Sequence, residues 1–138
     1  MLNRQRLALR VAAVLALITA ALHMYGQSQG FQSTVPAEQE LIRQVTTVRM
    51  QLPGGTERTL MDFLDGFGLI FAVFLAVTAA IAFLVARRAS SDPALANALA
   101  RMLAAAYIVL TVVSIAKFFI IPTICVGAVA LALIAAIV

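Results

Sequence analysis

One run of sequence sets the architecture: residues 63–86 read FLDGFGLIFAVFLAVTAAIAFLVA. The run contains a single charged side chain, Asp65, close to its start. A stretch of about 20 apolar residues is long enough to cross the hydrocarbon core of a bilayer as an α-helix. The stretch lacks the alternation of apolar and polar residues that a strand of a membrane barrel would show. We therefore predict a transmembrane helix here.

The chain as a whole has the composition of a membrane protein. It is 138 residues long, 63% hydrophobic and 12% charged, whereas an ordinary soluble domain is roughly 45–50% apolar and about 25% charged. Further apolar runs at 7–25, 98–119 and 123–138 complete a set of four spans. The sequence predicts an all-α, integral membrane four-helix antiparallel bundle that forms a single domain over residues 1–138. A nucleic-acid partner, which the net charge of +4 could suggest, is excluded because it needs a basic face on a soluble fold.

Local signals mark the ends of the predicted helices. Thr59 and Asp62 have the spacing of a capping box at the start of the second helix. Asp92 followed by Pro93 is typical of an N-cap and a first helical residue, so the third helix is expected to begin before its membrane span. Pro122 should interrupt the chain between the last two spans, because proline lacks a donor and disfavours helix at the preceding residue. We expect a tight hairpin of two helices there.

The distribution of lysine and arginine predicts the orientation in the membrane. Basic residues in short loops favour the cytoplasmic side, and one side of the predicted bundle carries six of them against one acid, Asp92. The other side carries four basic residues and five acids. Both termini are therefore expected in the cytoplasm, and the polar segment 26–60 is expected outside. The six are Arg4, Arg6, Arg10, Arg87, Arg88 and Arg101, and the four are Arg43, Arg49, Arg58 and Lys117.

The first apolar run also has some features of a signal peptide. Basic residues precede it, and it ends near the small residues Ala20 and Ala21. No convincing A-x-A cleavage site follows, and residues 22–25 continue the helical pattern. We expect this segment to be retained as the first span.

The external loop, residues 26–60, divides into a flexible start and a short helix. Residues 26–30 are rich in glycine, serine and glutamine. Pro36 suits a first helical position, and Pro53 with the two following glycines should end the helix. This amphipathic helix is expected to lie on the outer bilayer surface or to cap the bundle, with a lid over a site as the alternative. Its apolar face would consist of Leu41, Ile42, Val45 and Val48.

Polar side chains gather near the outer ends of the predicted helices and form a candidate ligand-binding site. No charged residue falls at mid-span, so the usual signature of an ion pathway is missing. On the third span, four polar residues follow one another at helical spacing and share one stripe. The candidate site consists of His23, Tyr25, Asp65, Tyr107, Ser114 and Lys117.

The histidine, the lysine and the aspartate of this site each also have a structural interpretation. His23 could simply pack and bond Asp65 or a backbone carbonyl, or it could be a pH-sensitive or ligand-binding group. Lys117 could extend to the headgroups, or pair with Asp65 or Asp62 to line a pocket for an anionic headgroup. The two aspartates could serve as helix caps. We predict no metal and no cofactor, because one histidine and the single Cys125 supply too few ligands and no redox disulfide.

Three short motifs carry a resemblance to a known group of proteins. They are RTLMDFLDGFG at 58–68, HMYG at 23–26 and FFIIP at 118–122. Together they resemble small bacterial four-helix integral membrane proteins, a DoxX-like assortment of families of unknown function. The resemblance implies a four-helix bundle in a bacterial plasma (inner) membrane and assigns no catalytic role to any residue. The paired cysteines of some redox-related membrane bundles are absent here, which argues against a redox role.

From these observations we expect a non-enzymatic accessory or interaction protein embedded in the lipid bilayer. Its expected partners are lipid and either a second copy of the chain or another membrane protein. The first alternative is a lipid-binding or small-molecule-binding protein, or a membrane enzyme, with its site at the outer leaflet. The second alternative is a small transporter that acts as an oligomer.

Overall fold

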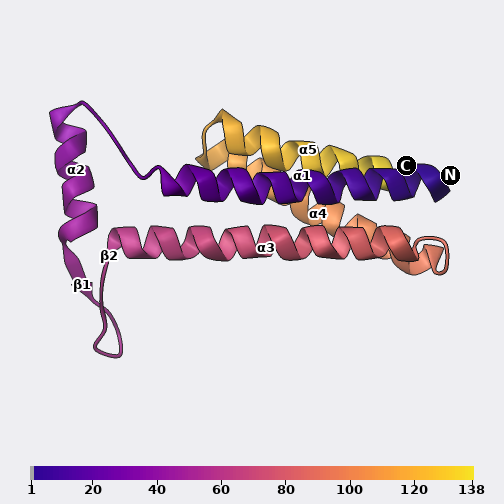
Figure 1. The fold of residues 1–138 in the computed structure, drawn as a ribbon, viewed down its shortest axis with the longest axis horizontal. Helices are drawn as coiled ribbons and strands as arrows, with labels where there is room; N and C mark the ends of the chain where they lie inside the picture. Colours follow the sequence, from indigo (N-terminus) through magenta and orange to yellow (C-terminus); the bar gives the residue numbers. More distant parts are fainter. Residues whose placement is uncertain (1) are drawn as a thin grey trace.

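The computed structural model describes residues 2–138 and contains four long helices that form a bundle (Figure 1). Each of the four is long and apolar enough to cross a membrane. The predicted all-α membrane bundle is thereby confirmed, and the chain is a multi-pass membrane protein. The long helices are α1 (Leu2–Ser28), α3 (Leu60–Arg88), α4 (Pro93–Lys117) and α5 (Ile120–Ile137).

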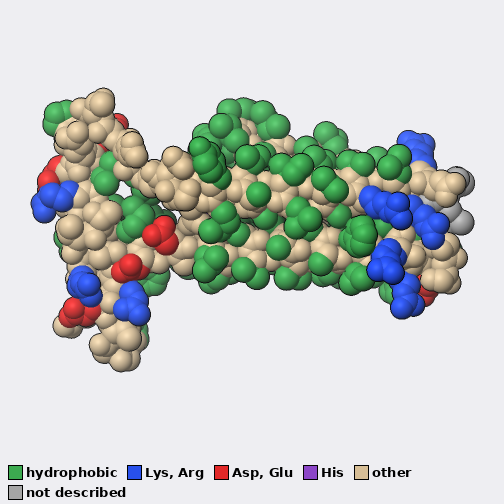
Figure 2. All heavy atoms as spheres, in the orientation of Figure 1, with side chains coloured by type: hydrophobic (Ala, Val, Ile, Leu, Met, Phe, Trp, Pro, Cys, Tyr) green, Lys and Arg blue, Asp and Glu red, His purple; other side chains and the backbone are tan. Residues whose placement is uncertain are grey.

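Helix α1 packs between α3 and α5, and α5 also packs along α4. The start of α1, the end of α5 and the α3–α4 turn lie at one end of the bundle, and residues 29–59 lie at the other (Figure 1). We call these the basic end and the loop end. In the face shown in Figure 2, blue basic side chains gather at the basic end, whereas the loop end carries both signs of charge.

The helices meet through small side chains. Lipid tails are as apolar as leucine, so helices in a bilayer associate mainly through close packing and hydrogen bonds, and small residues let their backbones approach. Large apolar side chains such as Leu17, Ile70 and Val109 are exposed on the outside of the bundle, where the bilayer would cover them. The buried alanines include Ala12, Ala16, Ala79, Ala82, Ala86, Ala100 and Ala104.

Two helix starts agree with the predicted caps. The Thr59 hydroxyl accepts from the Asp62 N–H at 3.1 Å, and the Asp62 carboxylate accepts from the Thr59 N–H at 2.7 Å. This is the complete capping box. The Asp92 carboxylate accepts from the Leu95 N–H at 3.0 Å, and Pro93 is the first residue of α4.

The predicted break at Pro122 is wrong. Helix α4 ends at Lys117, and α5 begins at Ile120, so Pro122 lies inside the first turn of α5. The N–H groups of a first turn have no partner within the helix, so the missing donor of proline costs little there. The earlier start gives α5 18 residues, about 27 Å at 1.5 Å per residue, which nearly matches the hydrocarbon core.

The segment after α1 differs from its predicted form in two places. Residues 26–28 continue α1 instead of forming a flexible loop, and the helical path ends before Gly30, whose φ is +62°. Helix α2 (Pro36–Thr47) has Pro36 in its first turn as predicted, and it runs across the loop end (Figure 1). Val48, which was expected on its apolar face, lies just beyond its last residue in an extended conformation.

A β-hairpin that was not predicted from the sequence follows α2. Strands β1 (Arg49–Gln51) and β2 (Glu57–Thr59) pair antiparallel, with Arg49 opposite Thr59. Gly54 and Gly55 take φ values of +90° and +76°, which glycine adopts without strain. The Pro-Gly-Gly sequence therefore forms the hairpin turn rather than the end of a helix.

Candidate functional site

His23 of α1 contacts α3 near the loop end. Its Nε2 atom lies 3.1 Å from the carbonyl oxygen of Gly68. Because a carbonyl only accepts, this contact assigns the proton to Nε2. The ring also meets the Phe71 ring edge-on, with the centroids 5.2 Å apart. Of the two partners expected for His23, the structure supplies a backbone carbonyl and not Asp65.

Gln27 is a second link between α1 and α3, and the sequence analysis did not single it out. Its amide nitrogen donates to the carbonyl oxygens of Leu64 and Asp65 at 3.3 and 3.4 Å. Gly68 makes room for this amide, because a Cβ atom at that position would clash with it. The sequence did contain a signal for this contact, because Gln27 follows His23 by four residues and the two side chains therefore lie on one face of α1.

Tyr107 and Ser114 bond neighbouring helices instead of facing a shared site. The Tyr107 hydroxyl of α4 lies 2.9 Å from Thr78 Oγ1 of α3, and both residues are buried. The Ser114 hydroxyl lies 2.9 Å from Thr123 Oγ1 of α5. These contacts join α4 to both of its neighbours in the bundle.

The remaining three candidate residues, Tyr25, Asp65 and Lys117, are exposed. Within residues 2–138, no ion pair shorter than 4 Å joins Lys117 to either aspartate; the pair found there is Glu40–Arg43 at 2.6 Å in α2. The Arg43 hydrogen bonds lower the pKa of the Glu40 carboxyl to about 2. Of the six candidate residues, His23, Tyr107 and Ser114 thus contact a neighbouring helix, and the other three are exposed.

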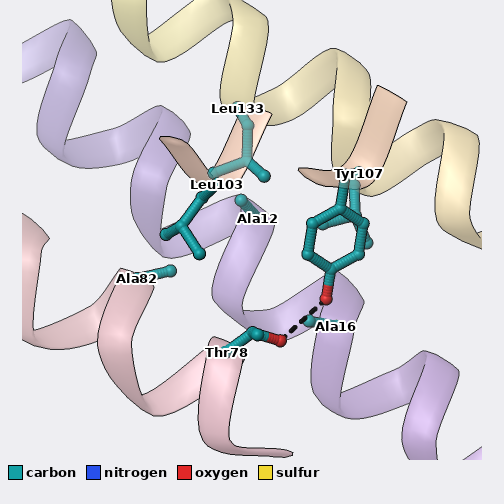
Figure 3. Close-up of a pocket in the computed structure, with 8 residues that line it drawn as sticks. Ala12, Ala16, Thr78, Ala82, Leu103, Tyr107 and Leu133 are labelled. Carbon is teal, nitrogen blue, oxygen red and sulfur yellow. Dashed lines mark hydrogen bonds between the residues drawn. The ribbon is translucent and has the colours of Figure 1, made fainter. Parts of the chain in front are cut away.

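The interior of the bundle is closed. Figure 3 shows side chains from all four long helices around the Tyr107–Thr78 hydrogen bond, among them Ala12, Ala82 and Leu133. The space between these side chains leaves no room for a water molecule. Tyr107 lines this space, so it holds the helices in place and does not face an open cavity.

The loop end contains an open cleft of about 300 Å³ between the hairpin and the first turns of α3. Ligand pockets in proteins begin at about this size. One part of the lining is apolar and the other carries two opposite charges. The lining residues are Leu52, Thr56, Arg58, Asp62, Phe63, Gly66, Phe67 and Ile70.

The local sequence explains the shape of this cleft. Residues 63, 66, 67 and 70 share one face of α3, since three- and four-residue steps bring side chains into line on a helix. Gly66 leaves that face hollow, because a Cβ atom placed there would have nothing within 4 Å. On the other side, the hairpin turn is closed by the Leu52 N–H, which donates to the Thr56 carbonyl at 2.9 Å.

The charged part of the cleft is held in place by backbone contacts. The capping box fixes Asp62 at the start of α3, and an Arg58 nitrogen donates to the Glu57 carbonyl at 2.8 Å. Arg58 and Asp62 lie on the same cleft without an ion pair between them in the part of the chain that the structure describes. Both side chains therefore keep hydrogen-bonding capacity for a ligand. Except for Asp62, none of these residues was predicted from the sequence to belong to a site.

The described residues, 2–138, contain no group of three or more histidine, cysteine, aspartate or glutamate side chains that could hold a metal ion. No protein family, no curated protein and no solved structure was found to match this chain. The similarity to DoxX-like bundles therefore stays an expectation from the sequence, and the case for function depends on the cleft.

Proposed function

We propose that this protein is a non-enzymatic membrane protein that binds an amphiphilic lipid at the outer leaflet of a bacterial plasma membrane. Its termini would lie in the cytoplasm, and the loop end would face outward. The single observation that carries the proposal is the cleft at the loop end, where an apolar wall on one face of α3 adjoins a pair of opposite charges, Asp62 in the first turn of α3 and Arg58 on β2.

The position of the cleft along α3 supports a lipid over a water-soluble ligand. Phe67 and Ile70 belong to the apolar part of α3, and both are about two-thirds exposed. Arg58 and Asp62 precede them, at the point where the chain enters the span. Charged side chains are costly in hydrocarbon and settle at the headgroup level. A lipid would thus place its acyl chain along Phe67 and Ile70 and its headgroup beside Arg58.

The orientation rests on the six arginines at the basic end. They are matched by a single acid, Asp92, whereas acidic and basic side chains are mixed at the loop end. The excess of arginine favours the cytoplasm for the basic end. A role as an accessory protein for another membrane protein, or as an oligomer, stays a prediction from the sequence.

The test is to fill the cleft without disturbing the bundle. Gly66→Leu adds a side chain where a Cβ atom meets nothing within 4 Å, and leucine is also the better helix former. Gly26→Leu is a matched control, since Gly26 is helical, lies near the same end and has equally open surroundings. Bound phospholipid is counted by native mass spectrometry after purification of the full chain in mild detergent.

We expect Gly66→Leu to lower lipid affinity about tenfold, a loss of about 1.4 kcal/mol of binding free energy, while Gly26→Leu keeps the wild-type value. Equal lipid binding by the wild type and both variants would overturn the proposal. So would a wild-type protein that retains no lipid under conditions where its helix content is intact.

A further inference from the structure

The basic end has a large excess of positive charge. Six arginines lie there with one acid, Asp92, and its carboxylate is engaged as the cap of α4. No ion pair shorter than 4 Å joins any of the six to a carboxylate within residues 2–138. On the face shown in Figure 2, blue basic side chains gather at this end of the bundle. An anion that bound to these arginines would therefore not have to displace a carboxylate from them.

Arg6 differs from the other five arginines because the fold holds it in place. It is half-buried, and its Nη2 atom donates to the Ser90 hydroxyl of the α3–α4 turn at 2.5 Å. Its Nε atom is buried and has no partner. A guanidinium has five N–H donors in a planar fork, and leaving a buried donor unpaired is costly. The side chain is thus positioned between α1 and the turn with unused donors.

Helix stability does not account for this placement. Arg4 and Arg6 lie at the start of α1, which has no acid in its first turn, and the helix dipole disfavours positive charge at that end. Membrane orientation requires only that positive charge be present. It does not require one guanidinium to be fixed by Ser90.

We infer that Arg6 and Ser90 form the centre of a binding site for the phosphate headgroup of an anionic phospholipid in the leaflet at the basic end. The planar guanidinium matches two phosphate oxygens at once, and Arg87 and Arg88 lie close to Ser90 in the chain. The neighbouring Leu7 and Val11 are exposed on α1 and offer an apolar surface to the acyl chains. This exposed apolar surface favours a membrane lipid over a soluble phosphate.

The test separates a fixed site from diffuse attraction by keeping the charge constant. Arg6→Lys preserves the positive charge and removes the planar fork, and Arg4→Lys is the matched control on an exposed arginine of the same helix. Affinities for phosphatidylglycerol and phosphatidylcholine are measured on the full chain by native mass spectrometry. We expect selective binding of phosphatidylglycerol by the wild type, a loss of about tenfold in Arg6→Lys and no change in Arg4→Lys.

Three results would overturn the inference. The first is an equal effect of Arg6→Lys and Arg4→Lys, which would mean diffuse attraction. The second is glycerol phosphate binding as tightly as phosphatidylglycerol, which would identify a soluble ligand. The third is loss of phosphatidylglycerol selectivity in Gly66→Leu, which would place the lipid in the cleft at the loop end. Ser90→Ala, which keeps all arginines, should lower the affinity several-fold and checks the site independently.

Discussion

The hydrogen bond between Tyr107 and Thr78 gives a sharp test of how the bundle is held together. The Thr78 hydroxyl has one proton, and it donates that proton to the Leu75 carbonyl at 2.9 Å. The Tyr107 hydroxyl must therefore donate to Thr78 Oγ1. This order makes the two partners unequal, because one side chain is the donor and the other is the acceptor.

The loss of stability should therefore depend on which of the two partners is removed. Tyr107→Phe deletes the donor and leaves only an unused acceptor lone pair, so we expect a loss of about 0.6 kcal/mol, the mean for hydrogen bonds between membrane helices. Thr78→Val deletes the acceptor and leaves the buried phenol O–H without a partner. The lining of this region leaves no room for a water molecule to replace it, so the expected loss is about 1–3 kcal/mol.

The assay is reversible unfolding in mixed detergent micelles, followed by circular dichroism, on both single variants and the double variant. Once Tyr107→Phe is present, Thr78→Val should add little, because no phenol is left unpaired. The difference between the two effects of Thr78→Val is the coupling energy. A coupling energy of zero, or a larger loss in Tyr107→Phe than in Thr78→Val, would refute the assigned donor order.

Three further predictions concern the ends of the bundle. Asp92→Ala should lower the free energy of unfolding by about 1 kcal/mol, because it removes the N-cap of α4; the same unfolding assay measures it, and an unchanged value would contradict the cap. The Glu40 carboxyl should titrate near pH 2 by NMR. Because its pKa is lowered on folding, its contribution to stability is present above the unfolded pKa of about 4.5 and is lost as the pH falls towards 2; Arg43→Gln should return the pKa towards its ordinary value. Cysteines introduced at Gln29 and Ser90 should react with an impermeant reagent from opposite sides, Ser90 from the cytoplasm; the reverse result would overturn the orientation.

Local signals in the sequence predicted most of the helices. The caps at Thr59 and Asp92 depend on residues three positions apart, so no knowledge of the fold was needed to recognise them. The structural effect of Pro122 was predicted wrongly because proline is compatible both with a break in the chain and with the first turn of a helix. The hairpin was missed because Pro-Gly-Gly ends a helix as readily as it turns a chain, and the flanking strands are only three residues long.

The candidate site was harder to predict than the fold. In a soluble helix, the apolar face identifies the core, but in a membrane helix the face towards lipid is apolar as well. Helical spacing alone could therefore not say that Tyr107 faces Thr78 while Lys117 is exposed. The cleft residues were hidden for the same reason, since Phe63 and Phe67 look like ordinary members of a span.

The sequence by itself determined that four segments of this chain are long and apolar enough to cross a membrane, where two of its helices are capped and how its charge is divided between two ends. These properties follow from hydropathy and from contacts within a single turn. Only the tertiary structure decided which helix faces meet, how the hairpin forms a cleft against α3, and that Arg6 reaches Ser90. Those contacts join residues far apart in the chain, and they depend on the rotation of each helix about its axis, which an apolar sequence on every face leaves open.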